Sequence, residues 1–170
     1  MAVATAALAK LQAARGARDE VYVAAVALRA TRGPAQMAMS VAYSLNLWGL
    51  QHFMVLIRPS SSSAPPPQIY VFDFQPTEPE NIYVALAALS GRSIAGSVLR
   101  RKLKRLPKER CWLVGSSGAD AVEASLKFNE SWKTDLRIGH HDCRDYTNAL
   151  VEYLTGERNV LERLRSSTVK

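Results

Sequence analysis

Two short apolar runs flank a spacer rich in serine and proline, and each run has the length of a β-strand. The run HFMVLI, at 52–57, is almost continuously apolar, which predicts a strand that is buried on both faces. The run IYVFDF, at 69–74, is equally rich in residues that favour strands. Because the spacer SSSSAPPP at 60–67 is too short to separate domains, we predict a solvated hairpin loop with antiparallel strands on either side.

Helical patterns and further strand patterns surround this hairpin. Strands are also expected at 20–28 and 111–114, the second of which runs into a Ser/Gly turn. Helices are expected at 34–45, 81–89, 119–132, 142–154 and 157–164. We therefore predict one α+β domain over residues 20–170, with an antiparallel sheet packed against helices.

The composition is that of a soluble globular domain without a membrane span. Apolar residues make up 48% of the 170 residues, and no stretch approaches the roughly 20 apolar residues that a spanning helix needs. Two cysteines far apart in the sequence favour a reducing compartment, so we expect a cytoplasmic or nuclear protein. Residues 1–19 form an Ala-rich extension that is basic over its first part. This extension is interpreted either as a frayed N-terminus or as an organellar import segment.

A basic segment, LRRKLKRLPKER at 99–110, carries seven basic residues and a single acid and accounts for most of the net charge of +7. Leucines at i, i+4 and i+7 predict a helix with a solvated basic face. A second interpretation is a docking surface in which Arg100, Arg101 and Lys104 bind an acidic protein or nucleic acid. No aromatic residue interleaves the run, which weakens the nucleic-acid interpretation.

The segment GHHDCRDYTNALVEYLTG at 139–156 predicts the clearest helix, with a cysteine in its first turn. Asp142 is the expected N-cap, and Cys143, Tyr146, Leu150 and Leu154 share one face, so the thiol points toward the body of the protein. Unpaired N–H groups at a helix N-terminus favour the nucleophilic thiolate, whereas the flanking carboxylates oppose it. The alternative is a buried free cysteine without a chemical role.

A thiol nucleophile needs a base and a group that orients the base. His52 opens the first apolar run, and Asp73 lies on an otherwise apolar face of the second run. If the two strands pair, the imidazole and the carboxylate can lie close together. Gln75, on the same face as Asp73, is a second candidate for orienting the base.

The adjacent His140 and His141 invite a comparison with zinc sites. A structural zinc site takes ligands from two separated pairs, and the sequence has no CxxC or second histidine pair. We therefore expect no metal and no cofactor, and we treat His141 as a candidate base or pocket residue.

A histidine that opens a strand, a second strand after a loop, and a later helix of the form xCxxYxxxLxxxLTG resemble the circularly permuted papain-like fold. The resemblance covers about residues 47–156 and is strongest to the cysteine helix of the PPPDE peptidases, which remove ubiquitin and SUMO. It extends to acyltransferases similar to lecithin:retinol acyltransferase and to relatives of NlpC/P60. Asp142 stands where the family has asparagine, Leu50 and Gln51 replace the usual residues before the histidine, and Asp73 lies near the place of a second-strand histidine.

The resemblance implies a hydrolase that cleaves an amide, isopeptide or thioester bond. Cys143 would be the nucleophile and His52 the general base, and Asp73 would orient the imidazole. Gln51 is a candidate second donor to the oxyanion, and the substrate would be a protein or peptide such as a ubiquitin-like modifier. Two alternatives remain: a non-catalytic interaction protein that docks through the basic segment, and a lipid acyltransferase.

Overall fold

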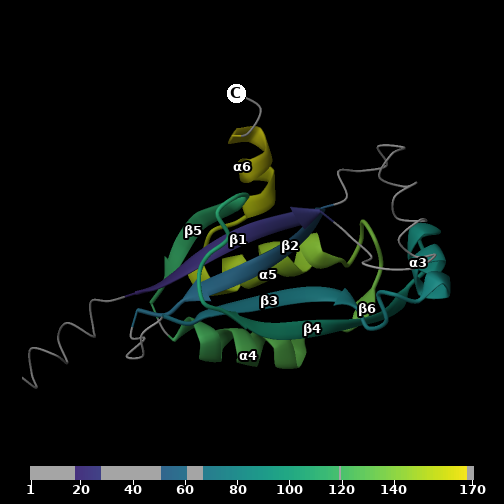
Figure 1. Cartoon of the computed structure of the whole chain (residues 1–170), viewed down its shortest axis with the longest axis horizontal. Coiled ribbons are helices and arrows are strands. Elements are labelled where there is room, and N and C mark those ends of the chain that lie inside the picture. Colours follow the sequence, from purple (N-terminus) through teal and green to yellow (C-terminus); the bar gives the residue numbers. More distant parts are fainter. Residues whose placement is uncertain (1–17, 28–50, 61–66, 119, 168–170) are drawn as a thin grey trace, which may run out of the picture.

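A six-stranded antiparallel sheet, with strand order β5-β1-β2-β3-β4-β6, organises the protein. The computed structural model describes residues 18–27, 51–60, 67–118 and 120–167 (Figure 1). The strands are β1 (Asp19–Ala27), β2 (Gln51–Arg58), β3 (Ile69–Pro76), β4 (Ile94–Leu103), β5 (Cys111–Ser117) and β6 (Asp135–Leu136). The antiparallel pairing of β2 with β3 confirms the predicted hairpin arrangement.

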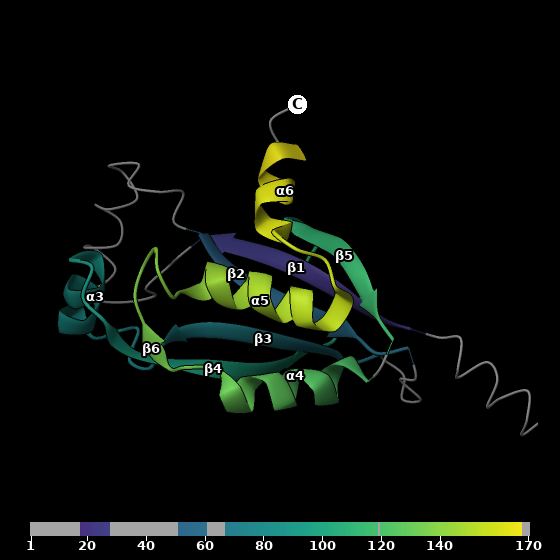
Figure 2. The same ribbon diagram turned by 180° about the vertical axis from the view of Figure 1, so that it is seen from behind.

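Helices pack against this sheet, which confirms the predicted α+β class. The described ranges contain α3 (Ile82–Leu89), α4 (Ala121–Ser131), α5 (Cys143–Thr155) and α6 (Val160–Ser167). Helix α5 crosses one face of the sheet and contacts β1, β2, β3 and β5. Figure 2 shows α5 in front of the sheet, with α4 beside it on the β4 side and α3 near β6. No helix in these ranges is long and apolar enough to span a membrane.

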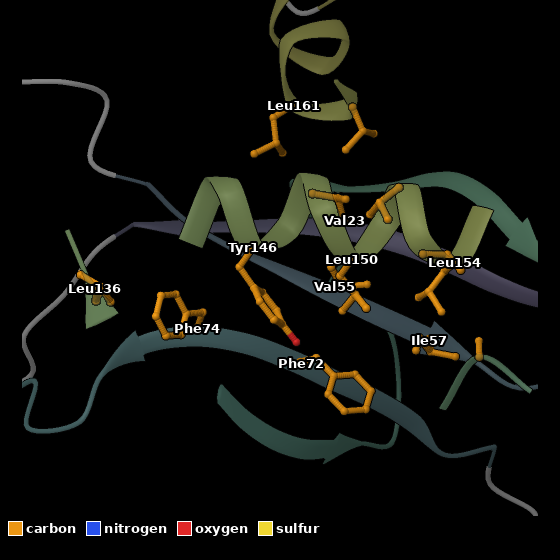
Figure 3. Packing of buried hydrophobic residues seen from close by; sticks show 14 residues of the cluster. Val23, Val55, Ile57, Phe72, Phe74, Leu136, Tyr146, Leu150, Leu154 and Leu161 are labelled. Atoms are coloured by element: carbon orange, nitrogen blue, oxygen red, sulfur yellow. The ribbon is translucent and has the colours of Figure 1, made fainter. Parts of the chain in front are cut away.

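The main hydrophobic core lies between α5 and the sheet (Figure 3). Tyr146, Leu150 and Leu154 project from one face of α5 and are buried, as the helical spacing predicts. They pack against buried strand residues, which include Val23, Val55, Ile57, Phe72 and Phe74. Burial of each large apolar side chain contributes about 1.5–3 kcal/mol, so this layer fixes the position of α5 on the sheet.

A second, smaller cluster lies on the opposite face of the sheet. Met54 and Leu56 belong to this cluster, whereas Val55 and Ile57 face α5. The central residues of β2 are therefore buried on both faces, as its almost continuous apolar run predicts.

Both ends of α5 follow the local sequence signals. Asp142 is the N-cap, and it forms a capping box with Asp145. Gly156, with φ +79°, ends the helix in the left-handed region that favours glycine.

The basic segment is not a helix, and this prediction is wrong. Residues 99–103 belong to β4, where Arg100 pairs with Phe72 and Arg101 with Val71 of β3. A spacing of four residues is even, so Leu99 and Leu103 share a face in a strand as well as in a helix. The i, i+4 spacing alone therefore does not distinguish the two structures.

Several boundaries also differ from the predictions, and some predicted elements fall outside the described residues. Strand β5 continues to Ser117, which pairs with Asp19, where a turn was expected. The last helix begins at Val160 instead of residue 157, after Asn159 in a left-handed conformation with φ +50°. Residues 1–17, most of the spacer at 61–66 and the predicted helix at 34–45 lie outside the ranges that the structure describes.

Candidate active site

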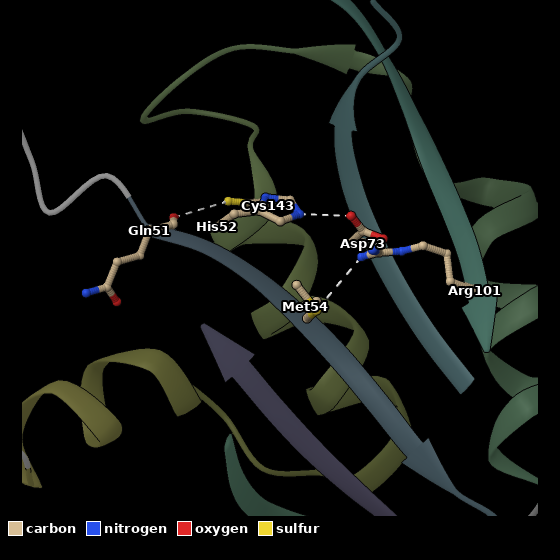
Figure 4. Close-up of polar contacts among 6 residues, drawn as sticks. All are labelled: Gln51, His52, Met54, Asp73, Arg101 and Cys143. Carbon is tan, nitrogen blue, oxygen red and sulfur yellow. Dashed lines mark hydrogen bonds and ion pairs between the residues drawn. The ribbon is translucent and has the colours of Figure 1, made fainter. Parts of the chain in front are cut away.

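The candidate site lies where β2 and β3 separate. Backbone pairing between these strands covers only residues 55–57 of β2 and 70–72 of β3. Strand β2 begins at Gln51 and β3 continues to Pro76, so both strands extend beyond the paired residues. Side chains, instead of backbone hydrogen bonds, connect the two strands there. Figure 4 shows His52 and Asp73 facing one another between these ends.

His52 and Asp73 form a buried pair. The His52 Nε2 atom lies 2.9 Å from Asp73 Oδ2. Only 9% of His52 and 1% of Asp73 are exposed, so water competes little for this hydrogen bond. Because Nε2 faces the carboxylate, the other ring nitrogen, Nδ1, is left for a different partner.

The thiol of Cys143, at the N-terminus of α5, lies beside the imidazole and interacts with it (Figure 4). The sulfur also lies 3.9 Å from the carbonyl oxygen of Gln51, a residue 92 positions away in the sequence. The structure thus brings together Cys143, His52 and Asp73 from α5, β2 and β3. Cys111, the other cysteine, lies in the small cluster on the face of the sheet opposite α5.

The surroundings of His52 favour its protonated form. Burial is the largest single influence and lowers the pKa, because it disfavours a charge. Hydrogen bonds and electrostatic interactions with Asp73 and Cys143 together outweigh burial and raise the pKa of His52 to about 9. The ring is therefore an imidazolium at neutral pH, next to the sulfur.

Arg101 contacts the carboxylate of Asp73 that also binds His52. Its Nη2 atom lies 3.2 Å from Asp73 Oδ1 and 3.9 Å from the sulfur of Met54. Asp73 therefore binds His52 through one oxygen and Arg101 through the other. From the sequence, Arg101 was expected either on a solvated helical face or on a docking surface, and neither interpretation indicated its contact with Asp73. In a strand, its position opposite Val71 places it on the face that carries Asp73.

The acidic residues around Cys143 are bound by backbone N–H groups. Asp142 accepts hydrogen bonds from the backbone nitrogens of Gly139, at 2.7 Å, and Arg144, at 2.8 Å. Asp145 accepts one from the backbone nitrogen of Asp142, at 2.9 Å. Within the described part of the chain, no acceptor binds the backbone N–H of Cys143, so this donor is available to a substrate oxygen.

Gln51 and His141 do not join the three central residues as expected. The side chain of Gln51 points away from Cys143, and its carbonyl oxygen faces the thiol instead (Figure 4). His141 stacks on Trp132, with ring centroids 4.5 Å apart. Its Nε2 atom lies 2.9 Å from the carbonyl oxygen of Lys133, and its ring contacts Phe74 as well as Trp132, so His141 belongs to an aromatic cluster.

The remaining predicted binding residues lie apart from the site. Arg100 sits over the ring of Tyr70, 5.2 Å from its centroid, and Lys104 follows the end of β4. Within the described ranges, no hydrogen bond or ion pair joins either cation to the three central side chains. Among the residues with described positions, no group of three or more His, Cys, Asp or Glu side chains is arranged to hold a metal ion.

Comparison with known proteins gives no family assignment. No family model, curated protein or solved structure matches the chain. The geometry of Cys143, His52 and Asp73 is therefore the evidence that bears on function.

Proposed function

We propose that the protein is a cysteine-dependent hydrolase that cleaves an amide, isopeptide or thioester bond. The observation that carries this proposal is the position of His52. One of its ring nitrogens binds a buried carboxylate, and the thiol at the start of α5 lies beside the same ring. A nucleophile, a base and a group that orients the base are the three parts that thiol catalysis requires.

In the proposed first step, the sulfur of Cys143 attacks as a thiolate whose proton has passed to Nδ1 of His52. The sulfur forms a bond to the substrate carbonyl carbon, and the carbonyl electron pair moves to oxygen. The backbone N–H of Cys143 is placed to donate to this oxyanion. When the bond to the leaving nitrogen or sulfur breaks, the leaving atom takes the proton from Nδ1 of His52. The products are a thioester on Cys143 and a neutral imidazole.

In the second step, water attacks the thioester carbonyl and transfers a proton to His52. The carbon–sulfur bond then breaks, which releases the carboxylic acid and restores the thiolate and imidazolium. Asp73 holds Nε2–H throughout, so that Nδ1 always faces the sulfur. Arg101 in turn restrains the other oxygen of Asp73 and is assigned a positioning role.

The arrangement also supports a permuted papain-like architecture. The base precedes the nucleophile in sequence, the base lies on a strand, and the nucleophile begins a helix that crosses the sheet. Asp142 serves here as a helix cap where the family has asparagine, and its carboxylate is bound by backbone N–H groups. By this resemblance, conjugates of ubiquitin-like modifiers are the proposed substrates.

Selective labelling tests the proposal. Chloroacetamide should label wild-type protein and Cys111→Ser at neutral pH, whereas Cys143→Ser should remain almost unlabelled. Burial raises the pKa of the Cys111 thiol, which makes it the slower nucleophile. Equal labelling of the two single variants would contradict the assignment of Cys143.

Activity is tested with aminocoumarin amides of ubiquitin and SUMO. Release of coumarin by wild-type protein, and none by Cys143→Ala, is the expected result. The burial of His52 favours one competing proposal, a non-catalytic interaction protein that keeps the same three residues. That protein would release no coumarin and would show the same thiol reactivity with or without His52.

A further inference from the structure

The outer edge of β4 is unpaired along most of its length. Strand β6 pairs only with Ile94 and Ala95 of β4. Beyond that point, over residues 97–103, no other strand of the described chain pairs with the side of β4 that faces away from β3. Every second residue there directs its backbone N–H and C=O groups away from the sheet, which is a template for one more strand.

This free edge is strongly basic. Arg100 and Lys102 are exposed within the strand, and Lys104 and Arg105 are exposed just after it. No carboxylate in the described ranges lies within ion-pair distance of these four cations. Arg101 differs from them, because its guanidinium binds Asp73 on the other face.

The side chains of Arg100 and Lys102 both lie over the ring of Tyr70. The Arg100 guanidinium and the Lys102 ammonium lie 5.2 Å and 5.4 Å from the centroid of its ring. Two positive charges therefore stand side by side on one face, two residues apart in the strand. The ring that could stack on a nucleic acid base is already occupied by these cations, which favours a peptide over single-stranded RNA.

We propose that the edge of β4 over residues 97–103 binds an extended acidic peptide segment of a partner protein by strand addition. Main-chain hydrogen bonds to the free edge would give affinity, and acidic side chains at alternate positions would face Arg100 and Lys102. The alternation follows from strand geometry, in which residues i and i+2 lie on the same face. This proposal does not depend on the hydrolase chemistry, because neither cation belongs to the candidate active site.

Fluorescence anisotropy with a labelled peptide of four Thr-Glu repeats tests the proposal, with the full chain as the binding protein. The peptide should bind wild-type protein and bind Arg100→Glu/Lys102→Glu about tenfold more weakly or worse, because two attractions become two repulsions. A peptide of four Thr-Lys repeats should show the reverse preference. This gain of binding also demonstrates that the double variant is folded.

Three controls give outcomes that would overturn the proposal. The variant Arg92→Glu/Arg165→Glu changes the net charge equally at exposed positions outside the basic segment, and equal weakening by this variant would indicate general electrostatics. Equal binding of a Thr-Glu peptide N-methylated at alternate residues would exclude strand addition. Tighter binding of a uridine octamer than of the acidic peptide would identify the partner as RNA.

Discussion

His52 has contrasting neighbours at its two ring nitrogens. Asp73 binds Nε2 at 2.9 Å, and the thiol of Cys143 lies beside the remaining nitrogen. Burial disfavours the imidazolium, yet its two partners raise the pKa of His52 to about 9, above the ordinary value of 6.5. The folded protein therefore holds this proton more tightly than the unfolded chain does.

This difference predicts a loss of stability at alkaline pH. The stabilisation from protonated His52 is fully present below about pH 6.5 and is lost as the pH rises through about 9. Urea unfolding between pH 6 and pH 9.5 should show the free energy of unfolding falling by up to about 3 kcal/mol. In Asp73→Asn the slope should be much flatter. A wild-type stability that is constant over this interval would contradict the protonated state of His52.

Arg101 and Arg100 are adjacent in sequence and lie on opposite faces of β4, so they form a matched pair. Arg101→Met leaves one oxygen of the buried Asp73 without its cation and should destabilise the protein by about 1–3 kcal/mol. Arg100→Met removes only a contact with the Tyr70 ring and should change stability by less than about 1 kcal/mol. Urea unfolding of both variants measures the difference. Equal destabilisation by the two substitutions would contradict a stabilising interaction between Arg101 and Asp73.

At the scale of the element, α5 combines a well-capped start with an apolar face. The capping box and Gly156 are readable in the sequence, because caps depend on residues within one turn of each other. The start of α5 is therefore fixed to the residue, and Cys143 occupies its first position. Strand β4 had no such local signal, because its leucine spacing fits both a strand and a helix.

Two substitutions of Asp142 distinguish its role as a helix cap from the effect of its negative charge. Asp142→Ala leaves the backbone N–H groups of Gly139 and Arg144 without an acceptor and should cost about 1–2 kcal/mol in the free energy of unfolding. Asp142→Asn retains an accepting oxygen and should cost less than about 1 kcal/mol. It should also speed alkylation of Cys143 at neutral pH, because a negative charge beside the thiolate is removed. Equal destabilisation by the two substitutions would show that the cap is not what Asp142 contributes.

At the scale of the whole molecule, the candidate site depends on how three elements meet. The sequence indicates the strands, the helix and the residues that carry the chemistry, since each follows a local pattern. The point at which β2 and β3 separate depends on strand register. The contact of Arg101 with Asp73 likewise depends on how distant segments pair. Such contacts have no local sequence signal, so the pairing of Arg101 with Asp73 was not predicted.

The packing of α5 on the sheet should control global stability. Leu150 is fully buried in the core, so Leu150→Ala should destabilise the protein by about 2–5 kcal/mol through the cavity it creates. Leu113→Ala removes a leucine that is 59% exposed and should cost less than about 1 kcal/mol. Thermal or urea unfolding compares the two. A Leu150→Ala variant as stable as Leu113→Ala would mean that α5 is not held by this core.

Alkylation of Cys143 at pH 7, measured with and without His52, shows whether the imidazole activates the thiol. In a Cys111→Ser background, chloroacetamide should react rapidly at pH 7, and His52→Gln should slow that reaction about tenfold or more, because the imidazolium that stabilises the thiolate is lost. Identical rates at pH 7 with and without His52 would contradict the account.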